Sequence, residues 1–188
     1  MNILVACEFS GRVRDAFRAK GHNAISCDLL PSERPGPHYQ GDVRDILNEG
    51  WDLVIAHPPC TYLAVTGRAW WRYRQKEQEE ALQFVQSLMD APIPRIAIEN
   101  PIGIISTRIR KPDQIIQPWM FGETWSKATC LWLKNLPGLF PTEIVSGRMQ
   151  SIENFANTPD RWKRKSRTFP GFAQAMADQW LVESAGVA

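Results

Sequence analysis

Residues 52–61 read DLVIAHPPCT, and this stretch decides the fold. Its first half is a short apolar run, which predicts a strand buried on both faces of a sheet. The two prolines that follow restrict the backbone as far as Cys60. Ligands of open α/β sheets bind at the carboxyl ends of the strands, so this placement favours a nucleophile. The alternative is a buried small side chain, which is what most free cysteines are.

Strands and helices alternate on both sides of this stretch. Apolar runs predict further strands at Asn2–Cys7, Asn23–Asp28, Arg95–Glu99 and Cys130–Leu133. Helical spacing predicts helices at Arg12–Lys20, Arg44–Asn48, Gln75–Asp90 and Ala173–Leu181. The alternation predicts an α/β fold with a mostly parallel central sheet and helices on both faces.

Length and composition describe an ordinary globular chain. Its 188 residues are expected to form a single domain over residues 1–188, and a net charge of +2 neither indicates nor excludes nucleic acid. The widely spaced Cys7, Cys27, Cys60 and Cys130 form no zinc or disulfide pattern, which favours a reducing cytoplasm and no metal site. No stretch has the length needed to cross a bilayer, so no membrane partner is expected.

Chemically useful groups follow the predicted strands. They are the turn Phe9-Ser10-Gly11, Asp28, Asp42, Cys60 and Glu99. A parallel sheet brings strand ends to one edge, so we expect these groups to gather there. The first turn lacks the glycine-rich phosphate cradles, and an acid after the second strand suits ribose hydroxyls. The predicted cofactor is therefore a nucleoside without a run of phosphates.

In this order the motifs resemble those of the cytosine-C5 DNA methyltransferases, particularly short forms of the kind carried by bacteriophages. The resemblance covers nearly the whole chain, with Thr168–Leu181 similar to the family's last motif. It implies a Rossmann-like S-adenosylmethionine-dependent methyltransferase fold and a cytoplasmic enzyme of the EC 2.1.1 class. The cofactor-binding residues that it implies are Phe9, Ser10, Gly11, Asp28, Asp42 and Pro58.

The same resemblance assigns the chemistry. Pro59-Cys60 matches the nucleophile motif, so Cys60 is expected to add to C6 of cytosine, which makes C5 reactive toward the methyl donor. Glu99-Asn100-Pro101 resembles the motif that holds the base, and burial is expected to raise the pKa of Glu99 for that role. Lys127 is expected to stabilise charge on the base carbonyl or to lower the pKa of the thiol.

The chain departs from the family pattern at several positions. Thr61 stands where the family has glutamine, and Pro101 stands where it has valine. Trp125, Lys127 and Thr129 replace a Gln-x-Arg-x-Arg segment. Residues 134–167 form a reduced insert, too short for a full target-recognition domain.

Two basic segments carry aromatic residues. Residues 62–74 are predicted to form a loop, and its part at Arg68–Arg74 is expected to close over the substrate. There Arg68 and Arg72 would contact phosphates, and Trp70 and Trp71 would stack on or replace a flipped base. Thr61 and Asn100 are further predicted substrate contacts. In the alternative interpretation the tryptophans pack on the next helix and the arginines are solvated. Arg161–Arg167 is either a second phosphate contact or a solubilising charge run.

Plainer interpretations apply to the single residues. Glu99 alone could cap a turn, Asp42 could cap a helix, and Asp28 and Lys127 could be exposed surface charges. His57 is expected to pack or to cap.

Three functional hypotheses follow. The first is a DNA cytosine-C5 methyltransferase with little sequence specificity, and the second is a methyltransferase acting on free pyrimidine nucleotides. The third is a catalytically inactive module that binds DNA or protein. The sequence indicates no oligomeric state.

Overall fold

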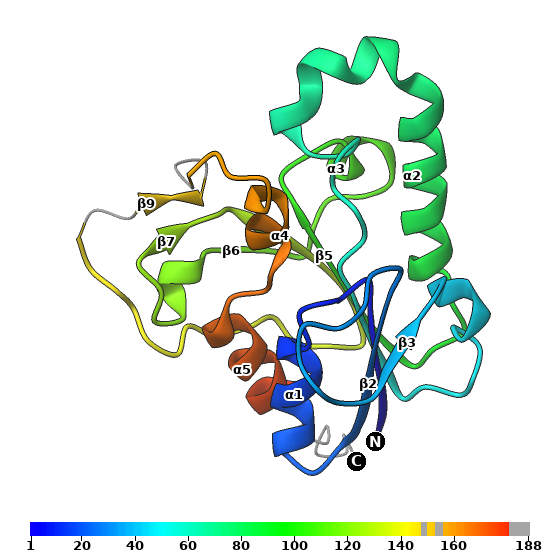
Figure 1. The fold of residues 1–188 in the computed structure, drawn as a ribbon, viewed down its shortest axis with the longest axis vertical. Helices are drawn as coiled ribbons and strands as arrows, with labels where there is room; N and C mark the ends of the chain where they lie inside the picture. Colours follow the sequence, from blue (N-terminus) through cyan, green and yellow to red (C-terminus); the bar gives the residue numbers. More distant parts are fainter. Residues whose placement is uncertain (148–149, 153–155, 181–188) are drawn as a thin grey trace.

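The computed structural model describes residues 1–147, 150–152 and 156–180. These residues form a seven-stranded central sheet in the order β3-β2-β1-β4-β5-β8-β6 (Figure 1). The strands are β1 (Asn2–Ala6), β2 (Asn23–Asp28), β3 (His38–Gln40), β4 (Leu53–Ala56), β5 (Arg95–Pro101), β6 (Gln114–Ile116) and β8 (Thr129–Lys134). Neighbours from β3 to β5 are parallel, and β8 runs antiparallel to both β5 and β6. A separate parallel pair joins β7 (Trp125–Ser126) to β9 (Gln150–Ser151).

Helices cover both faces of the sheet (Figure 1). On one face lie α1 (Arg12–Ala19) and α5 (Pro170–Gln179), and on the other lie α2 (Gln75–Met89) and α3 (Ile105–Arg108). The remaining described helical segments are η1 (Val43–Asp45), η2 (Val65–Tyr73), η3 (Pro118–Met120) and α4 (Arg161–Ser166).

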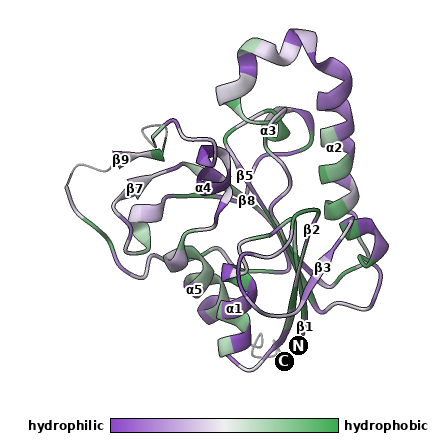
Figure 2. Cartoon of the chain, in the orientation of Figure 1, coloured by the Kyte–Doolittle hydropathy of each residue, from purple (hydrophilic) through white to green (hydrophobic). Residues whose placement is uncertain are grey.

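The core follows from the alternation of side chains along the strands. Ile3 and Val5 of β1 pack toward α1 and α5, whereas Leu4 and Ala6 pack toward α2. All four side chains are fully buried, so the strand is apolar on both faces. Figure 2 shows hydrophobic colouring along the strands at the centre of the sheet. The predicted α/β fold with a mostly parallel sheet and helices on both faces is confirmed.

Some local predictions need correction. Residues 62–74 do not form an irregular loop, because most of them belong to the 3₁₀ helix η2. The three-residue strands β3 and β6 were not predicted, since runs so short show no hydrophobic period. The final helix, predicted to reach Leu181, is described to Gln179, and Leu181 itself lies outside the described residues. Among the described helices, none combines the length and the apolarity that a membrane crossing requires.

Candidate active site

The structure brings the three predicted catalytic residues together. Cys60, Glu99 and Lys127 line one cavity of about 460 Å³, called here the cysteine cavity. Cys60 follows β4 and Glu99 lies in β5, and because these strands are parallel neighbours their carboxyl ends share an edge. Lys127 reaches this edge because β8 runs antiparallel to β5 and begins there, with Thr129 opposite Pro101.

Glu99 is held as an ionised carboxylate. Its side chain is 13% exposed, and its Oε2 lies 3.1 Å from Nδ1 of His57. Burial by itself raises the pKa of Glu99, but the Lys127 ammonium and the hydrogen bond from His57 outweigh burial and leave this pKa below its ordinary value. The expectation that burial would raise the pKa was wrong, because these two side chains come from other parts of the chain.

Cys60 rests as a neutral thiol. Burial is the largest effect on it and raises the pKa of the thiol, and the negative charge of Glu99 raises it further. Lys127 and Lys165 act in the opposite direction, as predicted for Lys127, without overcoming burial. At rest, the raised pKa therefore disfavours the thiolate form of Cys60.

Buried contacts hold the segment around Cys60. Asn100, 1% exposed, donates from Nδ2 to the carbonyl oxygen of Pro58 over 2.7 Å, so β5 is tied to the loop that ends in Cys60. After the cysteine, a Cβ on Gly103 would lie 2.0 Å from the carbonyl oxygen of Leu63, and glycine permits this close approach. The predicted contact of Asn100 with substrate stays a prediction, and in the structure its amide already binds Pro58.

A second cavity lies beside the first. It has a volume of about 240 Å³, and Asp28, Asp42, Cys7, Pro59 and Phe84 are among the residues that line it. We call it the aspartate cavity. It sits beyond the carboxyl ends of β1, β2 and β4, where the strand order reverses between β1 and β4. Such switch points are where open α/β sheets bind their ligands.

The two aspartates have different surroundings. Burial raises the pKa of Asp28, whose Oδ1 also accepts a hydrogen bond of 2.9 Å from the backbone N–H of Leu30. Asp42 is the N-cap of η1 and accepts from the backbone N–H of Arg44 at 2.9 Å, which confirms its interpretation as a helix cap. Hydrogen bonds from the Arg44 side chain and backbone lower the pKa of Asp42 to about 2.

The first turn is built around a buried carboxylate. Glu8 is 3% exposed, and its Oε1 accepts hydrogen bonds from the Ser10 hydroxyl at 2.8 Å and from the backbone N–H of Val13 at 2.9 Å. This arrangement closes the start of α1, while Gly11 turns the chain with a φ of 69°. Phe9 is buried, and its ring centroid lies 6.4 Å from that of Trp162.

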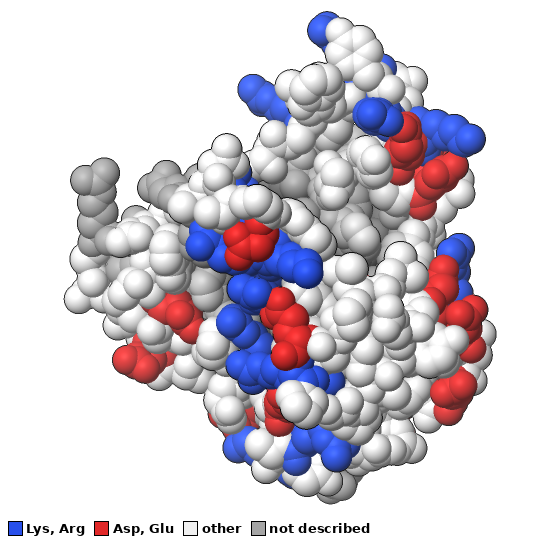
Figure 3. Space-filling view, in the orientation of Figure 1, with Lys and Arg blue, Asp and Glu red and all other residues white. Residues whose placement is uncertain are grey.

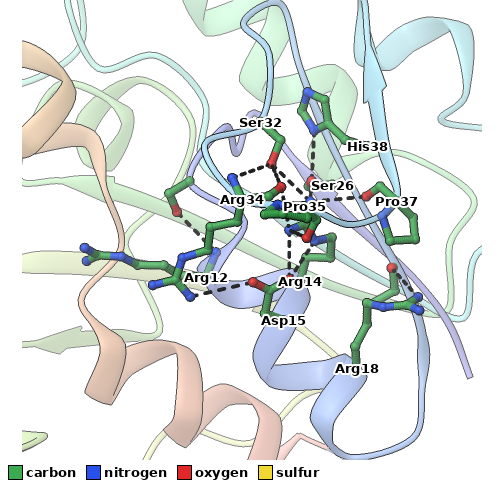
Figure 4. Close-up of polar contacts among 12 residues, drawn as sticks. Arg12, Arg14, Asp15, Arg18, Ser26, Ser32, Arg34, Pro35, Pro37 and His38 are labelled. Carbon is green, nitrogen blue, oxygen red and sulfur yellow. Dashed lines mark hydrogen bonds and ion pairs between the residues drawn. The ribbon is translucent and has the colours of Figure 1, made fainter.

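Arg14 fastens the loop that follows Asp28, as Figure 4 shows. Its guanidinium is fully buried and donates to the hydroxyls of Ser26 and Ser32, each at 3.1 Å, and to the carbonyl oxygen of Pro35 at 3.0 Å. A Cβ on Gly11 would lie 2.5 Å from Nη2 of Arg14. One side chain therefore packs under the first turn and holds the proline-rich loop at residues 31–37.

Most of the remaining predicted site residues line neither the cysteine cavity nor the aspartate cavity. Phe9, Ser10 and Gly11 adjoin Cys7 without lining the aspartate cavity, and Pro58 lines the cysteine cavity. Thr61, Arg68, Trp70 and Arg72 are exposed, and Trp71 is partly buried; none of these five lines either cavity. Trp70 is 68% exposed, and the Arg72 guanidinium lies 4.5 Å from the ring centroid of Tyr73. Their predicted contacts with substrate stay predictions.

The sequence reasoning missed two residues of the cysteine cavity. His57 lines the cavity beside the prolines, although it was expected only to pack or cap. Lys165 of α4 also lines it, and its carbonyl oxygen accepts a hydrogen bond of 3.2 Å from Nζ of Lys127. The basic composition of residues 161–167 was a signal, but the sequence did not place α4 beside Cys60. Among the described residues no cluster of side chains is arranged to hold a metal ion.

Comparison with known proteins supports the fold and assigns no family. No protein-family model and no curated protein matches the sequence. A solved structure from E. coli, described as a candidate DNA modification methyltransferase encoded within a prophage, is similar with a TM-score of 0.53 and 14% sequence identity. The similarity covers 85% of this chain and 56% of that one, so the chain spans little more than half the length of its structural relative. The likeness confirms the predicted fold, a mostly parallel α/β sheet arranged as in that methyltransferase structure.

Proposed function

We propose that this protein is an S-adenosylmethionine-dependent methyltransferase that modifies DNA cytosine at C5 through a covalent bond to Cys60. The observation that carries the proposal is that Pro59 lines both the aspartate cavity and the cysteine cavity. The proposed cofactor site and the proposed nucleophile site therefore share a wall, and Cys60 is the next residue in the chain after Pro59. Methyl transfer from a cofactor to a base held beside Cys60 requires two adjacent sites of this kind.

The aspartate cavity fits a nucleoside. Asp28 offers carboxylate oxygens to ribose hydroxyls, and Asp42 lies at the same cavity as an acceptor for an amino group. Phe84 and Val43 supply apolar walls for a flat ring. S-adenosylmethionine bound there would supply the electrophilic methyl group.

In the cysteine cavity the chain's own residues would activate the base. The Cys60 sulfur bonds to C6 as the thiol loses its proton, and the electron pair of the ring moves toward N3. Glu99, ionised at rest, accepts a hydrogen bond from the exocyclic amino group, takes up the proton that the thiol loses and passes it to N3 as negative charge develops there. The Lys127 ammonium is placed to stabilise negative charge that develops on the base carbonyl. After methyl transfer, water takes the C5 proton, the electron pair of the C5–H bond reforms the C5–C6 double bond and expels the thiolate, and the N3 proton returns through Glu99 to the sulfur.

A basic surface beside the cavity supports a polymer substrate. Figure 3 shows a band of Lys and Arg across the face of the molecule where α4 lies, with acidic side chains among them. Within α4 the basic residues are Arg161, Lys163, Arg164 and Lys165, and Lys165 also lines the cysteine cavity. Phosphates bound along α4 would bring a base of the same strand to Cys60.

Incubation of the protein with DNA and S-adenosylmethionine, followed by mass spectrometry of the nucleosides, tests the proposal. We expect 5-methylcytosine from the wild type and none from Cys60→Ala, whereas Cys130→Ala, which removes a thiol buried in the core, retains activity. DNA containing 5-fluorocytosine should trap a covalent complex on Cys60. Methylation of dCMP or dCTP with DNA untouched would favour a free nucleotide as substrate, and an absence of any methylated product would overturn the proposal.

A further inference from the structure

His57 occupies a buried position between the two groups that the proposed reaction uses. Its side chain is 8% exposed, it stands three residues before Cys60, and it lines the cysteine cavity. Nδ1 lies 3.1 Å from Oε2 of Glu99. The other ring nitrogen, Nε2, is buried and has no hydrogen-bond partner among the described residues.

These two environments decide the tautomer. A proton on Nδ1 forms a hydrogen bond to the Glu99 carboxylate, whereas a proton on Nε2 would be a buried donor without an acceptor. A doubly protonated ring would contain the same unpaired donor. The structure therefore favours a neutral imidazole with its hydrogen on Nδ1.

The histidine is also rigidly placed. Its backbone N–H donates to the carbonyl oxygen of Ala6 over 2.9 Å, and Pro58 follows it directly. The cation near Glu99, the Lys127 ammonium, is at the end of a flexible side chain and donates to the carbonyl oxygen of Lys165. His57 is thus stiffer than Lys127 as a partner of Glu99, which also has a side-chain hydrogen bond with Thr129.

We propose that His57 is a positioning residue for Glu99. Its Nδ1–H donates a hydrogen bond to Oε2, and this bond orients Oε1 toward the base bound in the cysteine cavity. The proposal rests on the proposed function for the identity of the base, but the tautomer and the bond to Glu99 do not depend on it. With one oxygen held by a neutral donor, the carboxylate presents a single acceptor in one orientation. The titratable groups that face this pair are the Lys127 ammonium, from the segment before β8, and the neutral thiol of Cys60, from the loop after β4.

Two variants separate the effect of the hydrogen bond to Glu99 from the effect of the size of the His57 ring. His57→Asn keeps an N–H donor near the position of Nδ1, and His57→Phe keeps the ring and removes the donor. The hydrogen bond from His57 lowers the pKa of the Glu99 carboxyl, so its loss in His57→Phe should raise that pKa, while the donor kept in His57→Asn should bring it back toward the wild-type value. His22→Phe is the matched control, since His22 lies beside the N-terminal amine, on a different element.

The ligand-free protein supplies the first measurements. Nitrogen NMR of the imidazoles should show His57 protonated at Nδ1 and not at Nε2, and carbon NMR should follow the titration of the Glu99 carboxyl in each variant. Methyl-transfer kinetics supply the second. We expect kcat of His57→Phe to fall about 100-fold with a much smaller change in KM, because a carboxylate turned away from the base loses alignment. The acidic limb of its kcat/KM profile should move to higher pH.

The outcomes distinguish the two proposals. A wild-type protein that transfers no methyl group refutes the proposed function, while the NMR measurements still decide the state of His57. Protonation at Nε2, or a Glu99 titration unchanged in His57→Phe, overturns the positioning role. So does a His57→Asn variant that is as impaired in kcat as His57→Phe while remaining folded.

Discussion

Asn100 binds Pro58: its side-chain Nδ2 donates to the proline carbonyl oxygen over 2.7 Å, across the boundary between β5 and the loop after β4. The bond joins residue 100, next to Glu99, to residue 58, two before Cys60. Because the two ends of this bond flank the two groups proposed to act on the base, its length helps to set the separation of the carboxylate and the thiol.

Asn100→Ala should therefore destabilise the protein and slow methyl transfer. The Pro58 carbonyl would be left buried without its donor, and we expect a loss of about 1–3 kcal/mol in the free energy of unfolding. Urea denaturation measures this loss. Asn23→Ala is the control, because Asn23 makes an exposed side-chain bond to Asn2 and its loss should cost less than about 0.5 kcal/mol. Equal losses in the two variants would show that the bond to Pro58 is unimportant.

Gly11 and Gly50 offer a matched pair of backbone positions. Both have positive φ, 69° and 80°, but a Cβ on Gly50 meets nothing within 4 Å, whereas one on Gly11 meets the buried guanidinium of Arg14. Gly50→Ala should cost about 1–2 kcal/mol for the left-handed conformation alone. Gly11→Ala should cost about 1–3 kcal/mol more because the Arg14 side chain has to move. Thermal unfolding of both variants checks the difference, and similar midpoints would contradict the role given to Arg14.

The reactivity of Cys60 should respond in opposite directions to its two charged neighbours. Its raised pKa predicts slower alkylation by iodoacetamide at neutral pH than that of a free cysteine. Glu99→Gln removes a negative charge that raises the thiol pKa and should speed alkylation, whereas Lys127→Met removes a charge that lowers it and should slow alkylation. Peptide mass spectrometry reads each cysteine separately. Cys27 and Cys130, whose pKa values are raised to about 12 and about 11, serve as slow internal references. A shift of the same sign in both variants would refute this electrostatic account.

Asp42 should contribute a pH-dependent part of stability. Its pKa is lowered to about 2 in the folded protein, whereas the pKa of an aspartate in the unfolded chain is about 4. A carboxyl whose folded pKa is depressed stabilises the protein above the unfolded value, and this contribution is lost as the pH falls through the folded one. Asp42→Asn keeps a capping side chain and loses the charge, so its stability should fall less between pH 4 and pH 2. The difference should be small because the partner, Arg44, is well exposed.

Asp42→Ala also loses the cap and should cost about 1 kcal/mol at pH 7. Urea unfolding at pH 6 and at pH 2.5 compares the three proteins. An Asn variant with the same acid sensitivity as the wild type would contradict the assignment.

The sequence predicts the central strands well and the electrostatics of the site poorly. The sequence predicts β1, β2 and β4 almost to the residue. The pattern is clearest in β1 and β4, because their apolar runs are buried on both faces. The strand at 129–134 is also predicted, but its direction is not, because hydrophobicity carries no orientation. That direction is what delivers Lys127 to Glu99.

The state of Glu99 shows the same limit more sharply. Local sequence indicates a carboxylate at the end of an apolar strand, and burial alone argues for a raised pKa. The partners that reverse the shift stand at positions 57 and 127, far along the chain on either side. Only the fold brings a histidine from one loop and a lysine from another to the same carboxylate.

Pro59 lines both cavities and fixes the distance between them. Its ring locks one backbone torsion, and the Cα atoms of successive trans residues are about 3.8 Å apart, so covalent geometry limits the span from the aspartate cavity to the sulfur. For a bisubstrate inhibitor, with a nucleoside at one end and a pyrimidine at the other, the distance between the two cavities would not adjust to the length of the linker. Linker length alone should then separate strong inhibitors from weak ones, with a sharp optimum.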